Sequence, residues 1–596
     1  MSAIWGIVDL HPGETEGQRK KRAGILRNEA NKMKTAYAKS RIDRIDERLQ
    51  EDCYLACGVQ YVTKEARREN FPYGTEQGQL FVADVILDNR ERMRRLFPEK
   101  VLEEGCPDGE ILYRCCTHRL SETLKEALGA YVCALFDRGK QELALFNDAV
   151  GNRSVYYLQA DGKIYFSTLL AGITCLRSQW ACNTPWFDRF FSMQDLRAVS
   201  EARQTPYRDI FRMEPGELIR FSRGGMHRNA YWDPFASRKI LRGKTEAVYR
   251  ELVAETFRAC VEDVIRGNHK ETGILLSGGL DSNAVAAYAA PVLKKQGKQL
   301  YSFTSVPEEL PRQKQPGQYA VEDEREAVEL VRRYQGNIEP AYLVTRKGDL
   351  LARNRQLLEL LEVPYKAVLN LPWMYESYLA AAEKGCGILL SGQYGNITIS
   401  YGDFRCLFLT LLHRGRLPTL ICEMNAYSRK YRKSRKWIWK DLLTADPRDD
   451  FRRVARYMYD KNALRQVGEY EVKLSLATGV IPRDPTRDKR LIELVLSLPL
   501  EQFTHDGQER CLVRRYMKGK IPAEILEDEF HKGRQAVGSA ELLEEQWEQI
   551  SRALYHRENE AVQAAGEKAA ETMSRELRVR MFYSGLALEY QRRFEL

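Results

Sequence analysis

The sequence predicts two domains of different class: an α+β domain rich in strands, then a parallel α/β domain with a helical C-terminal part. Up to about residue 235, short strand-like runs such as "QLFVADVIL" (79–87) alternate with turns. From residue 244, amphipathic stretches alternate with short apolar runs, which is typical of parallel strands joined by helices. Beyond about residue 403 helical patterns dominate. We therefore expect domains over 1–235 and 244–596.

The elements of the first domain follow from its turns. The stretch "YVCALFDRGKQELALFND" (131–148) predicts two strands joined by a hairpin turn over Asp137–Lys140. "GKIYFSTL" (162–169) predicts another strand. "GELIRFSRGGMHRNAYWDP" (216–234) continues the pattern through a Gly-Gly turn and ends at a proline, so the sheet-rich domain should end near there.

The elements of the second domain follow from alternating periodicity. We expect a helix over Thr245–Arg266 and a helix over Glu324–Tyr334. Short apolar runs predict buried strands at 273–276, at "LYSFTSV" (300–306) and at "GILLSG" (387–392).

Composition narrows the class of protein. The net charge of +10 over 596 residues is modest and does not indicate a nucleic-acid partner. Thirteen cysteines without repeated CxxC pairs favour reduced thiols in a cytoplasm. No apolar run is long enough for a transmembrane segment, and the start "MSAIWGIVDL" lacks the pattern of a signal peptide. We expect a soluble cytoplasmic protein.

A polar turn, "SGGLDS" (277–282), separates the strand at 273–276 from an alanine-rich helix. In an open parallel sheet, ligands bind beyond the carboxyl ends of the strands. Gly278 and Gly279 allow backbone angles closed to other residues, so successive N–H groups can surround an anion. Asp281 would repel a phosphate unless a cation lay between them. The turn therefore predicts a site for ATP with Mg²⁺, and an ordinary strand–turn–helix loop is the alternative.

Other stretches form an ordered set with this turn. They include "LSGQYGNITISYG", "GVIPRDPTRDKRLIELVLSLP" and "LVRRYMKGKIPAEILED" in the second domain, and "VADVILDNRERMRRLF", "LFNDAVGNRSVYYL" and "RDIFRMEPGELIRF" in the first. Together with the PP-loop signature "SGGLDS", they resemble the asparagine synthetase family over nearly the whole chain. The resemblance implies an N-terminal αββα sandwich of the N-terminal nucleophile type, glutaminase-like, followed by an ATP-pyrophosphatase domain.

The resemblance also implies an AMP-forming amide synthetase. A substrate carboxylate would attack the α-phosphorus of ATP, pyrophosphate would leave, and an amine would attack the acyl-adenylate. Lys532 would supply catalytic positive charge, with Arg534 as the alternative, and Asp281 would hold Mg²⁺ together with Asn396. The residues implied for ATP binding are Leu275, Ser277, Gly278, Gly279, Asp281, Ser282, Phe303, Thr304, Ser391 and Gly392.

The first domain departs from the glutamine-using members of that family. They begin Met-Cys, whereas this chain begins Met1-Ser2, and a hydroxyl is a weaker nucleophile than a thiol. Ala83-Asp84 replaces the family's Asn-Gly oxyanion segment, which sets a carboxylate where an anion must form. Asp108 aligns with the aspartate that holds the glutamine amine, but it cannot restore the site alone. We expect no glutaminase activity and a domain that is structural or shapes the substrate channel.

The second loop departs as well. Where asparagine-making members read SGEGSDE, this chain reads SGQYGNI (391–397). Gln393 replaces the general-base glutamate and cannot take a proton, and Asn396 replaces a carboxylate expected on Mg²⁺. Tyr394 lies one position away from the tyrosine of the base dyad in β-lactam synthetase, so the base stays unassigned. "RDPTRDKRLIEL" and "GRQAVG" look more like lasso peptide cyclases, which use an amine already present on the substrate.

Three functions stay open. The favoured one is macrolactam closure of a peptide, with a precursor peptide and a protease as partners. The second is amidation of a small acid or sugar acid with ammonia, and the third is a non-catalytic ATP-binding scaffold. A PP-loop enzyme that modifies tRNA fits less well, because the first domain and the C-terminal stretches match the synthetases.

Two charged segments have competing interpretations. "YSRKYRKSRKWIWK" (427–440) is favoured as a solvated helix face with Trp437 and Trp439 turned inward. The alternative is a surface for an acidic peptide, a membrane or a nucleic acid, and if the substrate is a peptide this is the first candidate to contact it. Glu324 and Glu326 either lie near the nucleotide, as acids in the family often do, or are exposed helix charges.

Overall fold

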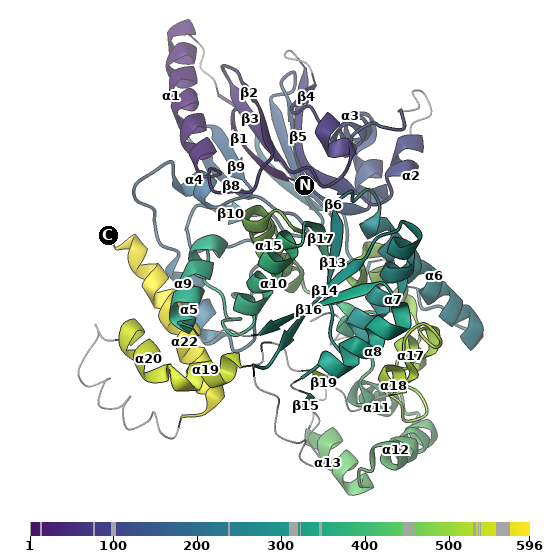
Figure 1. Cartoon of the computed structure of the whole chain (residues 1–596). Coiled ribbons are helices and arrows are strands. Elements are labelled where there is room, and N and C mark those ends of the chain that lie inside the picture. The colour runs from purple at the N-terminus through teal and green to yellow at the C-terminus, as the bar shows by residue number, and fades with distance from the viewer. Residues whose placement is uncertain are drawn as a thin grey trace.

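The computed structural model of the chain places two sheet-containing regions one above the other (Figure 1). It describes residues 2–11, 15–74, 78–96, 103–236, 239–308, 320–321, 323–344, 348–444, 456, 459–527, 532–533, 536, 538–555 and 573–595.

The first region is a sandwich of two six-stranded antiparallel sheets. One sheet has the strand order β10-β8-β9-β1-β3-β2 and the other β12-β11-β7-β6-β5-β4. The strands of the first sheet are β1 Ser2–Asp9, β2 Arg44–Leu49, β3 Cys53–Val59, β8 Tyr156–Ala160, β9 Lys163–Ser167 and β10 Phe211–Arg212. Those of the second are β4 Tyr73–Gly74, β5 Gln79–Leu87, β6 Gly129–Asp137, β7 Glu142–Asn147, β11 Glu217–Ser222 and β12 Gly225–Ala230.

Helices cover both outer faces of this sandwich. The helices α1 (Glu16–Thr35) and α4 (Ala171–Thr174) pack on the sheet that contains β1, and α3 (Asp108–Glu126) packs on β5 with α2 (Arg90–Arg95) beside α3. Apolar side chains such as Ile4, Leu55, Val82 and Phe146 fill the space between the sheets. The layers are therefore α, β, β, α, and the predicted sandwich is confirmed.

The second region contains a five-stranded parallel sheet with the order β16-β14-β13-β17-β18. Its strands are β13 Glu271–Leu275, β14 Leu300–Val306, β16 Ile338–Val344, β17 Cys386–Leu390 and β18 Ile481–Arg483. One face packs against α7 (Leu280–Lys295) and α8 (Arg325–Gln335), with α6 (Glu246–Ile265) behind α7. The other face packs against α10 (Leu371–Glu383) and α15 (Lys461–Thr478), with α9 (Leu350–Leu361) beside them (Figure 1). This is the predicted parallel α/β architecture.

The C-terminal part is helical, as predicted. Its elements are η2 Gly395–Ile397, α11 Phe404–His413, α12 Leu417–Tyr431, α13 Arg435–Thr444, η3 Pro485–Arg487, α16 Lys489–Ser497, η4 Leu500–Gln502, α17 Cys511–Tyr516, α18 Ala523–Glu527, α19 Ser539–Glu545, α20 Trp547–Tyr555 and α22 Arg575–Gln591. A short parallel pair joins β15 (Ala320–Val321) to β19 (Lys532–Gly533). The helix α22 returns to α5 (Thr184–Ser192) of the first region, where Tyr583 packs edge-on against Phe190.

Local sequence explains several element boundaries. Thr245 caps α6, because its hydroxyl accepts a hydrogen bond from the N–H of Val248. Gly336 ends α8 with φ of 79°, in the left-handed region that glycine adopts without strain. Among the described residues, no helix is long and apolar enough to cross a membrane.

Candidate active site

A cavity of about 480 Å³ opens at the carboxyl ends of β13, β14 and β17. This is the edge where an open parallel sheet binds ligands. The cavity is lined by Leu275, Leu276, Ser277, Gly279, Asp281, Ser282, Phe303, Ser305, Glu324, Trp373, Met374, Ser391, Gly392, Gln393, Asn396, Arg510 and Gly533. Residues from seven separate stretches thus meet at one site.

The turn between β13 and α7 is closed by its own polar side chains. The hydroxyl groups of Ser277 and Ser282 lie 3.0 Å apart. The side-chain amide of Asn283 donates to the carbonyl groups of Ser277 (2.9 Å) and Gly279 (2.8 Å). Gly279 has φ of −76°, so the expectation that it needs angles closed to other residues is wrong. The small size of Gly279, rather than its backbone freedom, opens the turn to a ligand.

Glu324 reaches this turn from the start of α8. The N–H of Gly278 donates to Glu324 Oε1 at 2.9 Å, and Glu324 is buried in the wall of the cavity. A carboxylate therefore already accepts from the loop that we expect to hold a phosphate. Of the two interpretations of these acids, Glu324 follows the one near the nucleotide, whereas Glu326 is exposed on the helix.

Asp281 lies in the first turn of α7 and faces the second loop. Its Oδ1 is buried without a hydrogen-bond partner, and burial raises the pKa of its carboxyl group to about 6. A Cβ at Gly392 would lie 2.9 Å from the Asp281 backbone, and one at Gly395 would lie 2.2 Å from Asp281 Oδ1. The glycines of the second loop thus permit its close approach to Asp281.

An unpaired buried carboxylate oxygen fits a cation. Mg²⁺ takes oxygen ligands and is commonly held by one or two carboxylates together with substrate phosphates. Asn396 fits less well, because its side-chain oxygen accepts a hydrogen bond from Arg510 Nη2 at 3.0 Å. Within the described ranges, no group of three His, Cys, Asp or Glu is placed to hold a metal. Asp281 would therefore need the oxygens of a nucleotide to complete the coordination.

The side chains of the second loop differ in whether they reach the cavity. Gln393 and Asn396 line the cavity. Tyr394 is buried among Val150, Trp232 and Tyr459, and burial raises the pKa of its hydroxyl group well above its usual range. Tyr394 thus lies outside the cavity lining, and Gln393 carries no group that can accept a proton.

The next strand supplies two residues to the cavity and one behind it. Phe303 and Ser305 line the cavity, whereas the hydroxyl of Thr304 donates to the carbonyl of Leu276 at 2.8 Å. Thr304 therefore holds the turn in place instead of facing the cavity. Alternation along a strand gives this result, since successive side chains point to opposite faces.

Sequence reasoning missed several residues that line the cavity. Ser305 follows from strand alternation with Phe303. Trp373, Met374 and Arg510 come from elements far away in the sequence, and no local pattern marks them.

The backbone of Lys532 lies at the edge of the site. It pairs with Ala320 in the parallel β15–β19 pair, and the following Gly533 lines the cavity. A Cβ at Gly533 would lie 2.1 Å from Glu324 Oε1, so this strand passes directly over the carboxylate at the phosphate turn. The side chain of Lys532 and the whole of Arg534 lie outside the described residues.

Two residues of the first domain that the sequence singles out, Asp108 and Asp84, are held in ion pairs. Asp108 Oδ1 accepts from Arg90 Nη1 at 2.8 Å, and its Oδ2 accepts from the N–H of Leu87 at 3.0 Å. Asp84 Oδ2 lies 3.2 Å from Arg153 Nε, with both side chains buried. Ser2 pairs through its backbone with Val59 in β3, and its side chain lies outside the described residues.

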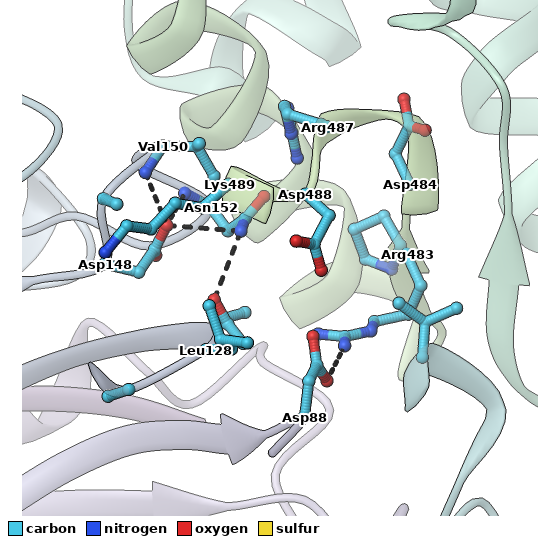
Figure 2. Close-up of a pocket in the computed structure, with 16 residues that line it drawn as sticks. Asp88, Leu128, Asp148, Val150, Asn152, Arg483, Asp484, Arg487, Asp488 and Lys489 are labelled. Carbon is cyan, nitrogen blue, oxygen red and sulfur yellow. Dashed lines mark hydrogen bonds and ion pairs between the residues drawn. The ribbon is translucent and has the colours of Figure 1, made fainter. Parts of the chain in front are cut away.

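A small polar pocket lies between the two domains and is lined by residues of both (Figure 2). Asp88 of the first domain forms an ion pair with Arg483, and Asp484 Oδ2 accepts from the N–H of Tyr394 at 3.0 Å. The guanidinium of Arg487 lies 5.5 Å from the centre of the Tyr394 ring. The pocket has room for about 30 Å³, so it holds water-sized groups at most.

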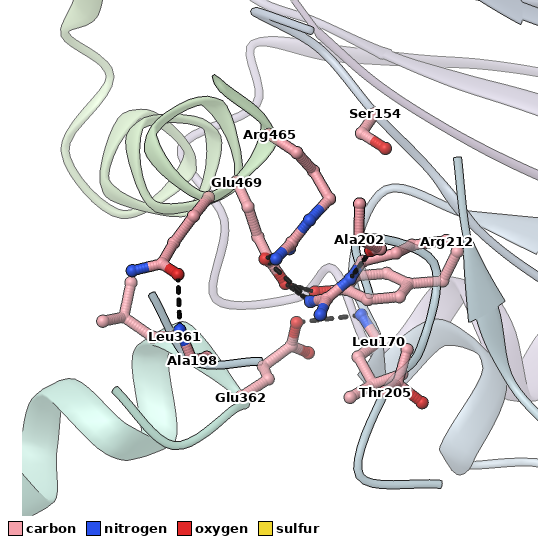
Figure 3. Close-up of polar contacts among 12 residues, drawn as sticks. Ser154, Leu170, Ala198, Ala202, Thr205, Arg212, Leu361, Glu362, Arg465 and Glu469 are labelled. Carbon is pink, nitrogen blue, oxygen red and sulfur yellow. Dashed lines mark hydrogen bonds and ion pairs between the residues drawn. The ribbon is translucent and has the colours of Figure 1, made fainter. Parts of the chain in front are cut away.

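A second contact between the domains is a buried cluster of ion pairs centred on Glu469 (Figure 3). Glu469 of α15 accepts from Arg212 Nη1 at 3.0 and 2.9 Å, and it also pairs with Arg465 and Lys473. The carboxylate of Glu362 accepts from the N–H groups of Leu170 (2.8 Å) and Ala171 (2.7 Å). The first domain thus contacts the second through ion pairs whose central residues, Arg212, Arg465 and Glu469, are buried.

The basic–aromatic segment differs from its favoured interpretation. Trp437 is 40% exposed and Trp439 is 39% exposed, so the prediction that they turn inward is wrong. Ile438 and Leu442, one helical turn apart, fill the inward face of α13 and leave the tryptophans outside it.

The fold and cavity together define a class: a glutamine-amidotransferase-type domain joined to a PP-loop domain that activates substrates with ATP. The family model described as asparagine synthase matches residues 252–580, and the glutamine amidotransferase domain model matches 88–232. The chain belongs to the asparagine synthase family, whose members are ATP-dependent ligases that form amide bonds.

Individual relatives are distant. The amidase chry2 of Gibberella zeae is 25% identical over 244 residues, which cover 40% of this chain and 34% of that protein. Asparagine synthetase [glutamine-hydrolyzing] 3 of Bacillus subtilis is 21% identical over 443 residues, 71% of this chain and 70% of its own length. A solved glutamine phosphoribosylpyrophosphate amidotransferase from B. subtilis matches 57% of this chain and 90% of its own at 11% identity, with a TM-score of 0.27. The chain thus spans about a third of the first relative.

Proposed function

We propose that this chain adenylates a substrate carboxylate with ATP and joins it to an amine carried by the same substrate, as in closure of a peptide macrolactam. The observation that carries the proposal is the unpaired, buried Oδ1 of Asp281, set beside the Ser277–Ser282 turn in the cavity. We also propose the division into domains at 1–235 and 244–596, and the cytoplasmic location stays a prediction.

ATP would bind along the edge of the sheet. Leu275 and Phe303 offer an apolar surface to the adenine, while Ser391 and Gly392 face the nucleotide from the second loop. The phosphates would replace the Glu324 carboxylate at the N–H of Gly278, assisted by the N-terminus of α7. Mg²⁺ bound between Asp281 and the phosphates would neutralise their charge.

The chemistry would proceed in two displacements. A carboxylate oxygen attacks the α-phosphorus, the bond from that phosphorus to the bridging oxygen breaks, and pyrophosphate leaves. The amine nitrogen then attacks the acyl carbon, AMP leaves with the oxygen, and the amide forms. Arg510 at the cavity, together with Lys532, would stabilise the negative charge that develops. The proton of the amine passes to solvent or to the leaving phosphate, because Gln393 and Asn396 cannot accept it.

The source of the amine follows from the first domain. Arg90 pairs with Asp108, which aligns with the aspartate that would hold the glutamine amine, and a buried carboxylate, Asp84 paired with Arg153, stands where the oxyanion would form. These pairs support an amine supplied by the substrate rather than one released from glutamine. A precursor peptide and a protease that trims it are the partners proposed on this basis.

Mass spectrometry of candidate precursor peptides incubated with the protein and Mg-ATP tests the proposal. Loss of one water from the peptide, with one AMP formed per product, is the expected result. Amidation of a small acid that requires added ammonium would favour the second candidate. Tight ATP binding without AMP formation for any substrate would favour a scaffold.

A further inference from the structure

A second cleft, of about 980 Å³, lies apart from the ATP cavity. Three stretches form most of it: the link between the domains, the end of α11 with the turn that follows, and the residues around η4. Tyr249 of α6 and Arg456 complete it. Its lining includes Phe235, Glu501 and four arginines, Arg242, Arg414, Arg416 and Arg456. Nothing in the adenylation chemistry requires this volume.

The lining is strongly basic at the rim and apolar at the base. The four arginines of the lining face a single carboxylate, that of Glu501, which pairs with Arg416 at 3.0 Å. Arg242 and Arg414 are exposed, whereas Tyr249, Leu498 and Leu500 are buried. Such a surface suits a ligand that carries both carboxylates and apolar side chains.

The wall of this cleft is joined to the second loop of the ATP cavity. The Phe235 ring packs edge-on against Tyr459 with 6.4 Å between centres, and the Tyr459 hydroxyl donates to the carbonyl of Ile397 at 2.6 Å. Ile397 ends η2, and its neighbour Asn396 lines the ATP cavity. Tyr459 therefore connects the wall of the cleft to the loop that lines the ATP cavity.

The length of α11 indicates the distance between the cleft and the ATP cavity. It begins at Phe404, shortly after η2, and ends at His413 in the cleft. Ten helical residues span about 15 Å, which an extended peptide covers in about five residues.

We propose that this cleft binds an acidic segment of the polypeptide whose carboxylate is adenylated in the ATP cavity. The inference rests on the proposed function and names its substrate class. The acidic segment should lie at least about five residues from the reactive carboxylate along the substrate. A nucleic acid is the less suitable ligand, because Arg456 lies over the Phe235 ring at 6.0 Å and covers the aromatic face that a base would stack on.

Binding of fluorescein-labelled peptides to the full chain, followed by anisotropy, tests this proposal. The probe is a short peptide of Glu and Leu, and the matched probe replaces each Glu with Gln. The double variant Arg242→Glu/Arg414→Glu reverses two exposed charges of the cleft, and Arg27→Glu/Arg333→Glu reverses two exposed charges on α1 and α8. We expect the cleft variant to bind the acidic probe about tenfold or more weakly, the control to stay within about twofold, and the Gln probe to bind weakly to both.

Several results would overturn the proposal. Equal losses in the cleft variant and the control would show attraction by net charge alone. A loss confined to Lys436→Glu/Lys440→Glu would move the site to α13, and stronger competition by an oligonucleotide than by the acidic peptide would exclude a polypeptide ligand.

Failure of the proposed function gives a different pattern. ATP binding and pyrophosphate release with small carboxylates, measured on the same proteins, report on the ATP cavity alone. Adenylation of small acids without cleft-dependent peptide binding would disprove the proposed docking site and leave the proposed function standing. Cleft-dependent peptide binding without pyrophosphate release for any carboxylate would disprove both the proposed function and the assignment of the peptide as substrate.

Discussion

Asp281 carries a charge that the folded protein accommodates poorly without a cation. Burial raises the pKa of its carboxyl group to about 6 from an ordinary value of 3.8. The folded state therefore binds the proton more tightly than the unfolded state, and stability falls as the pH rises from about 4 through 6. The cost reaches about 3 kcal/mol at neutral pH.

Asp281→Asn should remove that cost. Without Mg²⁺ and nucleotide, we expect the variant to have a higher free energy of unfolding than the parent by up to about 3 kcal/mol near pH 7, and the difference to vanish below about pH 4. Mg-ATP should raise the melting temperature of the parent more than that of the variant. A variant less stable than the parent at neutral pH would contradict the view that burial of the Asp281 carboxyl group outweighs its polar contacts.

Two glycines of the site should differ in their tolerance of alanine. A Cβ at Gly392 meets the Asp281 backbone at 2.9 Å, which cannot move without shifting α7, whereas a Cβ at Gly279 meets only the Ser277 hydroxyl at 3.2 Å. Gly392→Ala should lower the melting temperature and ATP affinity together. Gly279→Ala should keep the melting temperature and weaken only ATP binding, measured by calorimetry. Equal melting temperatures for the two variants would show that the close approach does not matter.

Sequence predicted the residues of the phosphate turn but not all of their partners. Ser277, Asp281 and Ser282 could be found because they follow one strand directly. Glu324 contacts the turn from 46 positions along the chain from Gly278, a pairing that only the packed sheet establishes. Arg510 gave no local signal, since its role depends on the path of the chain after η4.

The helix α15 contributes Glu469 to the domain contact. Burial alone would raise the pKa of Glu469, but Arg212, Arg465 and Lys473 outweigh it and hold the pKa below its usual value. A carboxyl group with a lowered pKa stabilises the fold above its ordinary pKa, and this contribution is lost as the pH falls.

Glu469→Gln should leave the buried Arg212 and Arg465 without their counter-charge, whereas Lys473 keeps the carboxylate of Glu362 at 3.3 Å. We expect a loss of about 3–5 kcal/mol, with both domains affected because Arg212 belongs to the first and α15 to the second. The exposed pair of Glu548 and Arg552 is the control, and Glu548→Gln should cost less than about 1 kcal/mol. Denaturation that left the two variants equally stable would show that the cluster does not couple the domains.

Elements with strong periodicity were predicted closely. The runs at 79–87 and 300–306 coincide with β5 and β14. The segment 427–440 failed at the level of its side chains, because a helix with aliphatic residues on its inward stripe has no room there for Trp437 and Trp439. Periodicity alone does not show that Ile438, rather than Trp437 or Trp439, is the buried residue.

At the scale of the whole molecule, the first domain packs against the second, and we predict that it has no glutaminase activity. Ser2→Cys should therefore not create glutaminase activity, even if the initiator methionine is removed. Asp108 would still be paired with Arg90, and Asp84 would still stand in the oxyanion segment. Glutamate release from glutamine is the measurement, and turnover that depends on the new cysteine would contradict this view of the domain.

The central claim is that the cavity at the end of the parallel sheet adenylates a carboxylate. Pyrophosphate release from Mg-ATP, measured with and without candidate carboxylates, tests it most directly, with Asp281→Ala as the control. We predict release that depends on a carboxylate and disappears in the variant. Bound ATP with no release for any carboxylate, or release that persists in Asp281→Ala, would contradict the account.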